Sequence, residues 1–206
     1  MTRQWISMFL LLSLPSAAFA EELNYAFFQA DRLEYQAEDE ATVWDLQGWY
    51  GGDLHKFWWK LEGSDAQITN NDVQLLYSRA ITPWFDFQAG VLLEFVDSEN
   101  TAAAIVGLQG MAPYGLELDV ATFITEHGDV GLKAEAERDF YFTQKLMLQP
   151  RLEFVDSSAA ASELDLGIRL RYEFSRQVAP YLGVSWHFRG DSDNDETLLA
   201  GLRFWF

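Results

Sequence analysis

After residue 20 the chain is built from short segments in which apolar and polar residues alternate, and turn residues separate them. In the clearest segment the apolar set is Leu164, Leu166, Ile168, Leu170, Tyr172 and Phe174, and the opposing set is Glu163, Asp165, Gly167, Arg169, Arg171 and Glu173. Side chains of a strand point alternately to opposite faces, whereas a helix would mix the two sets. Repeated segments of about ten alternating residues are typical of transmembrane β-barrels.

Twelve such segments divide the chain, and an even number is usual for single-chain bacterial barrels. The segments are 24–37, 41–51, 54–63, 71–81, 84–96, 101–111, 114–125, 129–141, 144–155, 162–174, 179–189 and 196–206. Connections after the even segments are short and often contain Pro, whereas those after the odd segments are acidic or polar. Because short turns of such barrels face the periplasm, we predict an all-β, transmembrane, antiparallel up-and-down β-barrel of about 12 strands.

The first twenty residues have the composition of a secretory signal peptide. Arg3 is followed by an apolar run from Trp5 to Leu14 and by Ala18-Phe19-Ala20, a small-residue cleavage motif. The apolar run is too short for a transmembrane helix, which needs about 20 residues. We therefore predict a cleaved signal peptide at 1–20 and a barrel at 21–206, located in a Gram-negative outer membrane among its lipids.

The last segment carries a second targeting feature. Gly201, Phe204 and the terminal Phe206 lie in an alternating apolar stretch. This resembles the signal by which the barrel-assembly machinery recognises outer-membrane substrates, where an exposed final strand pairs by β-augmentation. The alternative is an ordinary terminal strand.

The excess of acidic residues argues against a nucleic-acid partner. The chain has 32 acidic residues against 14 Lys and Arg, a formal charge of −18, and no cysteine. Phosphate binding needs a basic patch, so a nucleic-acid partner is not expected. Without disulfides, a closed barrel that pairs every backbone group within the bilayer supplies the stability.

By alternation, many charged and amide side chains should face the barrel lumen. They are Asp45, Gln47, Asp86, Gln88, Glu94, Glu117, Asp119, Glu135, Glu137, Arg151, Glu153, Asp165, Arg169, Arg171 and Glu173. A small barrel fills its interior with side chains, and charges there must pair or meet water. Two interpretations stay open: a salt-bridged plug that stiffens the barrel, and an acidic path for cations.

Several stretches resemble the copper resistance protein B family of outer-membrane proteins. The more specific ones are Gln47-Gly48-Trp49-Tyr50-Gly51-Gly52-Asp53 and Gln149-Pro150-Arg151-Leu152-Glu153, and the likeness covers nearly all of 21–206 in the same order. The resemblance implies copper tolerance through binding or passing copper as a transient ligand, without an organic cofactor and with periplasmic copper proteins as partners. Family members often carry a Met- and His-rich segment before the barrel, but residues 21–30 contain neither residue type.

Candidate copper ligands are few. Copper prefers thioether and imidazole groups, with carboxylates or amides for Cu(II). The candidates are His127, His187, Met147, Asp191 and Asp193, and no pair has the spacing H-x-x-x-H. We expect His127 and His187 near the outer mouth with the aspartates, and the alternative is a set of isolated surface or lumen histidines.

Two other function classes remain as alternatives. A small outer-membrane porin or structural barrel would need no metal role. An outer-membrane lipid hydrolase would need a nucleophile, and Ser185 with His187 is the obvious pair. A Ser–His pair also requires a third group that positions the base, and none is evident, so we do not expect an enzyme.

Overall fold

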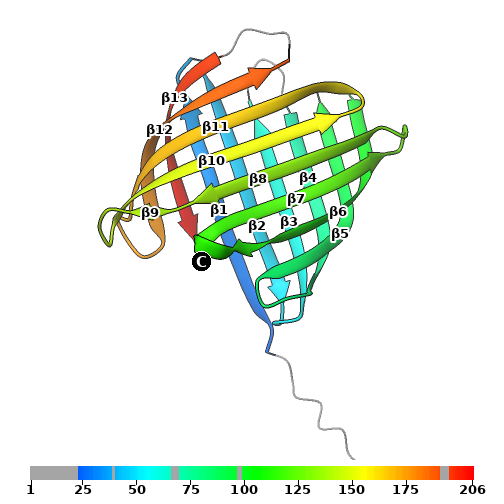
Figure 1. Ribbon diagram of the computed structural model, residues 1–206, viewed down its shortest axis with the longest axis horizontal. Helices are drawn as coiled ribbons and strands as arrows, with labels where there is room; N and C mark the ends of the chain where they lie inside the picture. The colour runs from blue at the N-terminus through cyan, green and yellow to red at the C-terminus, as the bar shows by residue number, and fades with distance from the viewer. Residues whose placement is uncertain (1–22, 39, 66–69, 97–98, 191–194) are drawn as a thin grey trace, which may run out of the picture.

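The computed structural model describes residues 23–38, 40–65, 70–96, 99–190 and 195–206. They form one antiparallel sheet that closes into a barrel (Figure 1). The strands are β1 (Tyr25–Gln36), β2 (Ala41–Gly51), β3 (His55–Ser64), β4 (Asn70–Ala80), β5 (Phe85–Val96), β6 (Glu99–Ala112), β7 (Leu116–Thr125), β8 (Val130–Arg138), β9 (Phe140–Tyr141), β10 (Leu146–Ser157), β11 (Ala160–Tyr172), β12 (Val178–Arg189) and β13 (Asp195–Trp205). A short 3₁₀ turn, η1 (Pro113–Gly115), joins β6 to β7.

The barrel wall contains twelve strands, as the alternation predicts. The short β9 and the preceding β8 both pair with β10, so they are two parts of one strand that is interrupted at Asp139. The first strand closes the wall by pairing with the last, with Gln29 opposite Trp205 and Gln36 opposite Leu199. The predicted signal peptide, 1–20, lies outside the described residues.

An even number of strands places Tyr25 and Trp205 at one end of the barrel, which we call the terminal end (Figure 1). It also carries the connections 52–54, 81–84, 113–115, 142–145 and 173–177. The opposite end, the far end, carries the connections from β1 to β2 and from β12 to β13. Connections at the two ends have similar lengths, so the ends differ in the composition of their connections rather than in length. The terminal end carries the connections that often contain Pro, and it is the predicted periplasmic side.

A β-bulge shifts the alternation in the middle of β1. The register with β2 shifts between Ala30, which is opposite Leu46, and Arg32, which is opposite Asp45. The extra residue is Asp31, and a bulge of one residue exchanges the two faces of the strand beyond it. Strand β1 therefore directs Gln29 inward before the bulge and Arg32 and Glu34 inward beyond it, which simple alternation from 24 to 37 does not predict.

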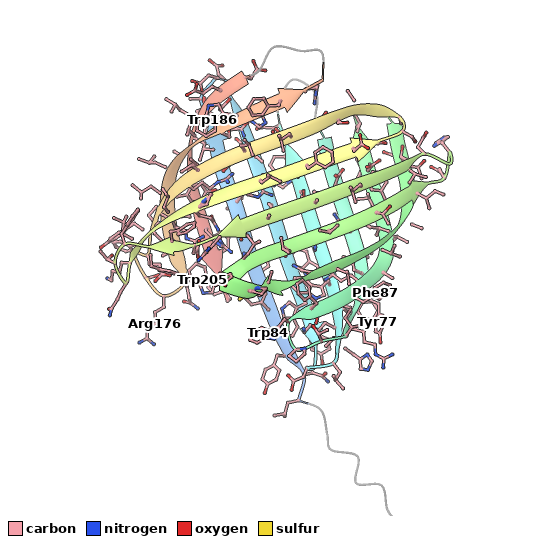
Figure 2. All side chains as sticks on the ribbon, in the orientation of Figure 1. Tyr77, Trp84, Phe87, Arg176, Trp186 and Trp205 are labelled. Atoms are coloured by element: carbon pink, nitrogen blue, oxygen red, sulfur yellow. The ribbon has the colours of Figure 1, made fainter. Side chains whose placement is uncertain are left out.

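The outer surface is apolar and rich in aromatic residues. Exposed aromatic side chains lie toward both ends, with Tyr77, Trp84 and Phe87 near the terminal end and Tyr35 and Phe95 near the far end. Figure 2 shows the half-buried Trp186 near the far end as well. Aromatic girdles at the two interfaces are characteristic of membrane barrels. No helix among the described residues has the length and apolarity needed to cross a bilayer.

Part of the lumen is apolar. Leu76, Leu92, Ile105 and Phe123, from four consecutive strands β4 to β7, pack together with exposed fractions of 8% or less. The Phe123 ring occupies the space that a side chain at Gly131 would need, since a Cβ there would lie 2.2 Å from the ring. The lumen side of β4 to β7 therefore contains a small hydrophobic cluster in addition to charged groups.

Candidate functional site in the barrel lumen

The predicted lumen residues differ in their degree of burial. Asp45, Gln88, Glu137, Arg151, Glu153, Arg169 and Arg171 are buried. Gln47, Asp86, Glu117, Asp119 and Glu135 line a large cavity, and Asp165 lines a small one. Glu94 is half-buried opposite Asp72, and Glu173 lies just past the end of β11, where its backbone N–H donates to the carbonyl of Lys145.

The most deeply buried ion pair joins Glu34 on β1 to Arg169 on β11. The carboxylate is 2% exposed, and the guanidinium Nη2 lies 3.0 and 3.2 Å from its two oxygens. The Nε of Arg169 also donates to Glu34 at 3.2 Å, and the hydroxyl of Tyr181 donates a further hydrogen bond at 3.2 Å. A buried carboxylate needs such compensation, because leaving it unpaired would cost several kcal/mol.

Four more arginines extend this pair into what we call the arginine cluster, composed of Arg32, Arg151, Arg169, Arg171 and Arg203 with their acidic partners. Its shorter contacts are Arg151 to Glu135 at 2.5 Å and to Glu153 at 2.9 Å, Arg32 to Asp45 at 3.3 Å, Arg203 to Asp31 at 2.8 Å and Arg171 to Asp139 at 2.5 Å. Arg32 also contacts Glu153, and Arg203 contacts Glu137, both at 3.8 Å. The cluster fills the lumen beside β1 and β10 to β13 with paired charges, as the plug interpretation requires.

A cavity of about 450 Å³ occupies the other side of the lumen, along β2 to β8. It extends from Pro83 and Trp84 in the β4–β5 turn, at the terminal end, to Lys133 and Glu62 deeper in the barrel. Its cations are lysines rather than arginines. Lys56 pairs with Asp86 at 2.7 Å, and the other pairs are Lys60 with Asp119 and Lys133 with Glu62.

Cross-strand register connects the cavity to the far end through one continuous row, which we call the acidic ladder. Each member is the direct partner of the next on the adjacent strand: Asp86, Gln109, Asp119, Glu135, Glu153, Asp165, His187 and Asp195. Direct cross-strand partners have Cβ atoms about 4.5–5.5 Å apart. Because β5 begins at the terminal end and β13 at the far end, the row runs the length of the barrel.

The structure separates the predicted metal ligands. Met147 is fully buried on β10 near the terminal end, and its sulfur accepts hydrogen bonds from Arg171 at 3.0 and 3.2 Å. His187 lies near the far end, where its Nδ1 contacts Asp165 and its Nε2 is 3.4 Å from the Ser185 hydroxyl. His127 is exposed in the β7–β8 connection.

The two aspartates of the same prediction, Asp191 and Asp193, lie outside the described residues. In the described part of the chain, no group of three or more His, Cys, Asp or Glu side chains has the arrangement of a metal site. The geometry therefore offers a succession of single oxygen ligands along the wall and no closed coordination cage.

Asp31, Arg32 and Glu34 were missing from the predicted lumen set, although they anchor much of the arginine cluster. The alternation gave no assignment for them, because Asp31 shares the parity of Leu33 and Tyr35; the bulge at Asp31 explains this by changing the phase within β1. The consecutive charges Asp31 and Arg32 inside an alternating segment were the available indication, since two neighbouring charges cannot both face the lumen of a regular strand.

The residues of the predicted assembly signal lie where the last strand, β13, pairs with β1 and closes the barrel. Phe204 is opposite Ala30, and the backbones of Phe206 and Phe28 exchange hydrogen bonds of 2.9 and 3.2 Å. The Tyr181 ring covers Gly201, where a Cβ would lie 2.4 Å from the ring. Glycine at this position thus lets the tyrosine reach Glu34.

Comparison with solved structures shows the fold. The NanC porin matches with a TM-score of 0.61 and 13% identity, covering 87% of this chain and 99% of the porin chain. The KdgM porin matches with a TM-score of 0.56 and 16% identity, covering 89% and 99%. Both are closed outer-membrane barrels of similar size, and at these identities the likeness concerns architecture alone.

Comparison with sequences shows the family. Copper resistance protein B from Escherichia coli is 35% identical over 208 residues, which is 89% of this chain and 70% of the relative. A homolog from Pseudomonas syringae pv. tomato is 33% identical over 205 residues, 88% and 70%. The family model for the copper resistance protein B precursor (CopB) matches residues 24–206. The chain therefore belongs to the copper resistance protein B family of outer-membrane β-barrel proteins.

Proposed function

We propose that this barrel binds copper ions transiently along the acidic ladder and passes them through its lumen, and so contributes to copper tolerance. Copper is the cargo in this proposal and not a resident cofactor. Membership of the copper resistance protein B family supports the choice of metal. The continuity of the ladder from Asp86 to Asp195 is the observation that carries the proposal.

The ladder suits weak, repeated contacts with Cu(II). Carboxylate and amide oxygens are acceptable ligands for this ion, and neighbouring members are close enough for it to exchange between them. In the cavity Asp86, Asp119 and Glu62 are already paired with Lys56, Lys60 and Lys133. An arriving cation displaces an ammonium group, which lowers the affinity and favours release.

A second candidate function is a narrow porin for small solutes. The cavity of about 450 Å³ at the terminal end favours it, since it has room for a small organic molecule. The arginine cluster fills the opposite side of the lumen and argues against broad diffusion. Solute flux into liposomes distinguishes the two functions, because ladder binding alone predicts no flux of uncharged solutes.

The proposal also includes two kinds of protein partner, one during assembly of the barrel and one during copper transfer. The terminal pairing of Phe206 with Phe28 is consistent with recognition of the final strand by the barrel-assembly machinery. With the terminal end in the periplasm, periplasmic copper proteins would meet the open side of the cavity. Asp165 and Ser185 contact the two ring nitrogens of His187, so the structure supplies the third group that the sequence did not reveal. No enzymatic role is proposed, because Ser185 is 5% exposed and the cavity beside it measures only about 30 Å³.

A complementation experiment tests the proposed function. The chromosomal gene is deleted, and the wild type, the double variant Asp86→Asn with Asp119→Asn, or the control Asp53→Asn with Asp156→Asn is supplied in its place. The control removes the same charge from exposed positions. We expect the ladder variant to restore copper tolerance poorly and the control to restore it fully. Unchanged tolerance and cell copper content after deletion would refute the proposal.

A further inference from the structure

One patch of the lipid-facing surface has a layered composition. Outward residues of β1 to β4 form cross-strand rows, and the first row is Phe28, Gly48, Trp59 and Leu75. The second row, closer to the terminal end, is Ala26, Tyr50, Phe57 and Tyr77. The third contains His55 opposite Arg79. Rows two residues apart are separated by about 6.6 Å along the strand, so apolar, aromatic and polar layers follow one another toward the terminal end.

A groove of about 480 Å³ on the outer surface is bordered by six residues of these rows, Ala26, Phe28, Tyr50, Phe57, Trp59 and Leu75. The Trp59 ring lies over Gly48, where a Cβ would be 2.7 Å from it, and stacks on Phe28 with a centroid distance of 5.7 Å. The flanking side chains of Tyr50 and Phe57 are 61% and 67% exposed. The result is a recessed apolar floor with aromatic walls, a shape that accepts a hydrocarbon chain.

The polar row supplies a cation at the end of the groove. Arg79 is exposed, and among the described residues it takes part in no ion pair. His55 stacks on Tyr77 at 5.8 Å and its Nδ1 lies 2.5 Å from the tyrosine hydroxyl, so the ring is held beside Arg79. Eight other cations of the strongly acidic chain face the lumen, namely Arg32, Lys56, Lys60, Lys133, Arg151, Arg169, Arg171 and Arg203.

We propose that this patch is a binding site for an anionic phospholipid, with an acyl chain in the groove over Gly48 and the phosphate at Arg79 and His55. Charge complementarity selects this occupant, because a guanidinium favours a phosphate and the adjoining groove is apolar. The order of the rows matches a lipid whose headgroup lies toward the terminal end. The site is independent of copper and of the lumen.

Native mass spectrometry of the folded barrel tests the site, with phosphatidylglycerol as the probe and phosphatidylcholine as the comparison. We expect the wild type to retain one phosphatidylglycerol preferentially. Arg79→Gln should reduce that retained fraction about fivefold, the effect of one interfacial cation. Phe57→Ala should reduce retention of both lipids, because it opens a groove wall and leaves the headgroup contacts in place.

Arg176→Gln is the matched control, because Arg176 is an exposed cation of the same end in the β11–β12 connection, away from the groove (Figure 2). It should retain phosphatidylglycerol as the wild type does. Heat-modified mobility on gels shows which variants are folded, and only folded samples are compared. Equal retention by Arg79→Gln and the wild type would overturn the proposal. A dimer that Phe57→Ala converts to monomer would also overturn it, since the groove would then be an interface between copies.

Discussion

The two sides of the lumen hold their charges differently. Among the described residues, the ion-pairing cations that β1 and β10 to β13 contribute to the lumen are arginines, packed against buried carboxylates such as Glu34. Glu153 joins the two sides, because it contacts Arg151 at 2.9 Å and Lys133 at 3.4 Å. Beside β3 to β8 the cations are lysines, and their carboxylate partners line a cavity of about 450 Å³. Similar chemical pairs therefore produce a filled interior on one side and an open one on the other.

Side-chain chemistry accounts for the difference. A guanidinium is planar and binds a carboxylate through two donors, as Arg169 does with Glu34, so the pair is rigid and space-filling. An ammonium group is a point charge on a flexible chain that another cation can displace. We infer that the arginine cluster stabilises the barrel and that ions first meet the acidic ladder in the lysine-lined cavity, before the ladder reaches Glu153, which Arg151 contacts at 2.9 Å. The predictions below test that division.

The largest effect is expected from Glu34→Ala. Removing the carboxylate leaves Arg169 buried without its partner, which costs about 3–5 kcal/mol in the free energy of unfolding. Urea titration in detergent micelles, followed by tryptophan fluorescence, measures it. Glu163→Ala is the control, because the pair of Glu163 with Arg189 at 2.6 Å is exposed and worth about 0–1 kcal/mol. Equal losses in the two variants would contradict a structural role for the cluster.

Gly201→Ala should have the next largest effect. The new methyl group overlaps the Tyr181 ring and moves its hydroxyl away from Glu34, at a cost of about 1–3 kcal/mol. The same unfolding titration applies. In a Tyr181→Ala background the overlap is gone, so Gly201→Ala should then cost much less. Additive losses in the double variant would show that the glycine serves another purpose.

On the cavity side, Lys60→Leu should strengthen copper binding. The change frees Asp119 from its counterion and removes a repelling charge without adding a copper ligand, so the affinity for Cu(II) should rise about fivefold. Calorimetric titration of the folded barrel measures the affinity. Lys145→Leu, in the β9–β10 connection, removes the same charge outside the lumen and should leave the affinity unchanged. A decrease for Lys60→Leu would mean that the lysine itself supports binding.

The smallest effects are expected at the far end. His187→Ala removes one ladder member and should weaken Cu(II) binding by about threefold, below 1 kcal/mol, since other oxygen ligands remain. His127→Ala should have no effect, because this side chain is exposed in the β7–β8 connection. The same titration decides both. An unchanged affinity for both variants would reject a histidine contribution at the mouth.

Alternation along the chain was sufficient to predict the strands. The segment 84–96 corresponds to β5 (Phe85–Val96), and 41–51 to β2 (Ala41–Gly51). The reason is local: in a barrel wall each strand has one face in lipid and one in the lumen, so every segment displays the period of two. The bulge at Asp31 interrupts that period and could be placed only through the register with β2.

The sequence was sufficient to predict which kinds of residue line the lumen, but not which of them lie opposite one another. Alternation identifies Asp119 and Glu153 as lumen residues, yet the ladder depends on which residue of each strand is opposite which residue of the next. That register follows from the stagger of the closed sheet, which no single segment encodes. The choice between a filled and an open interior likewise depends on the position of each arginine and lysine around the barrel.

Copper affinity of the ladder tests the central claim most directly. Cu(II) is titrated into the folded wild type, the ladder variant Asp86→Asn with Asp119→Asn, and the exposed control Asp53→Asn with Asp156→Asn. The ladder variant leaves Lys56 and Lys60 without counterions, so its affinity should fall about tenfold or more, whereas the control should match the wild type. Equal affinities for the ladder variant and the control would contradict the assignment of copper to the lysine-lined side of the lumen.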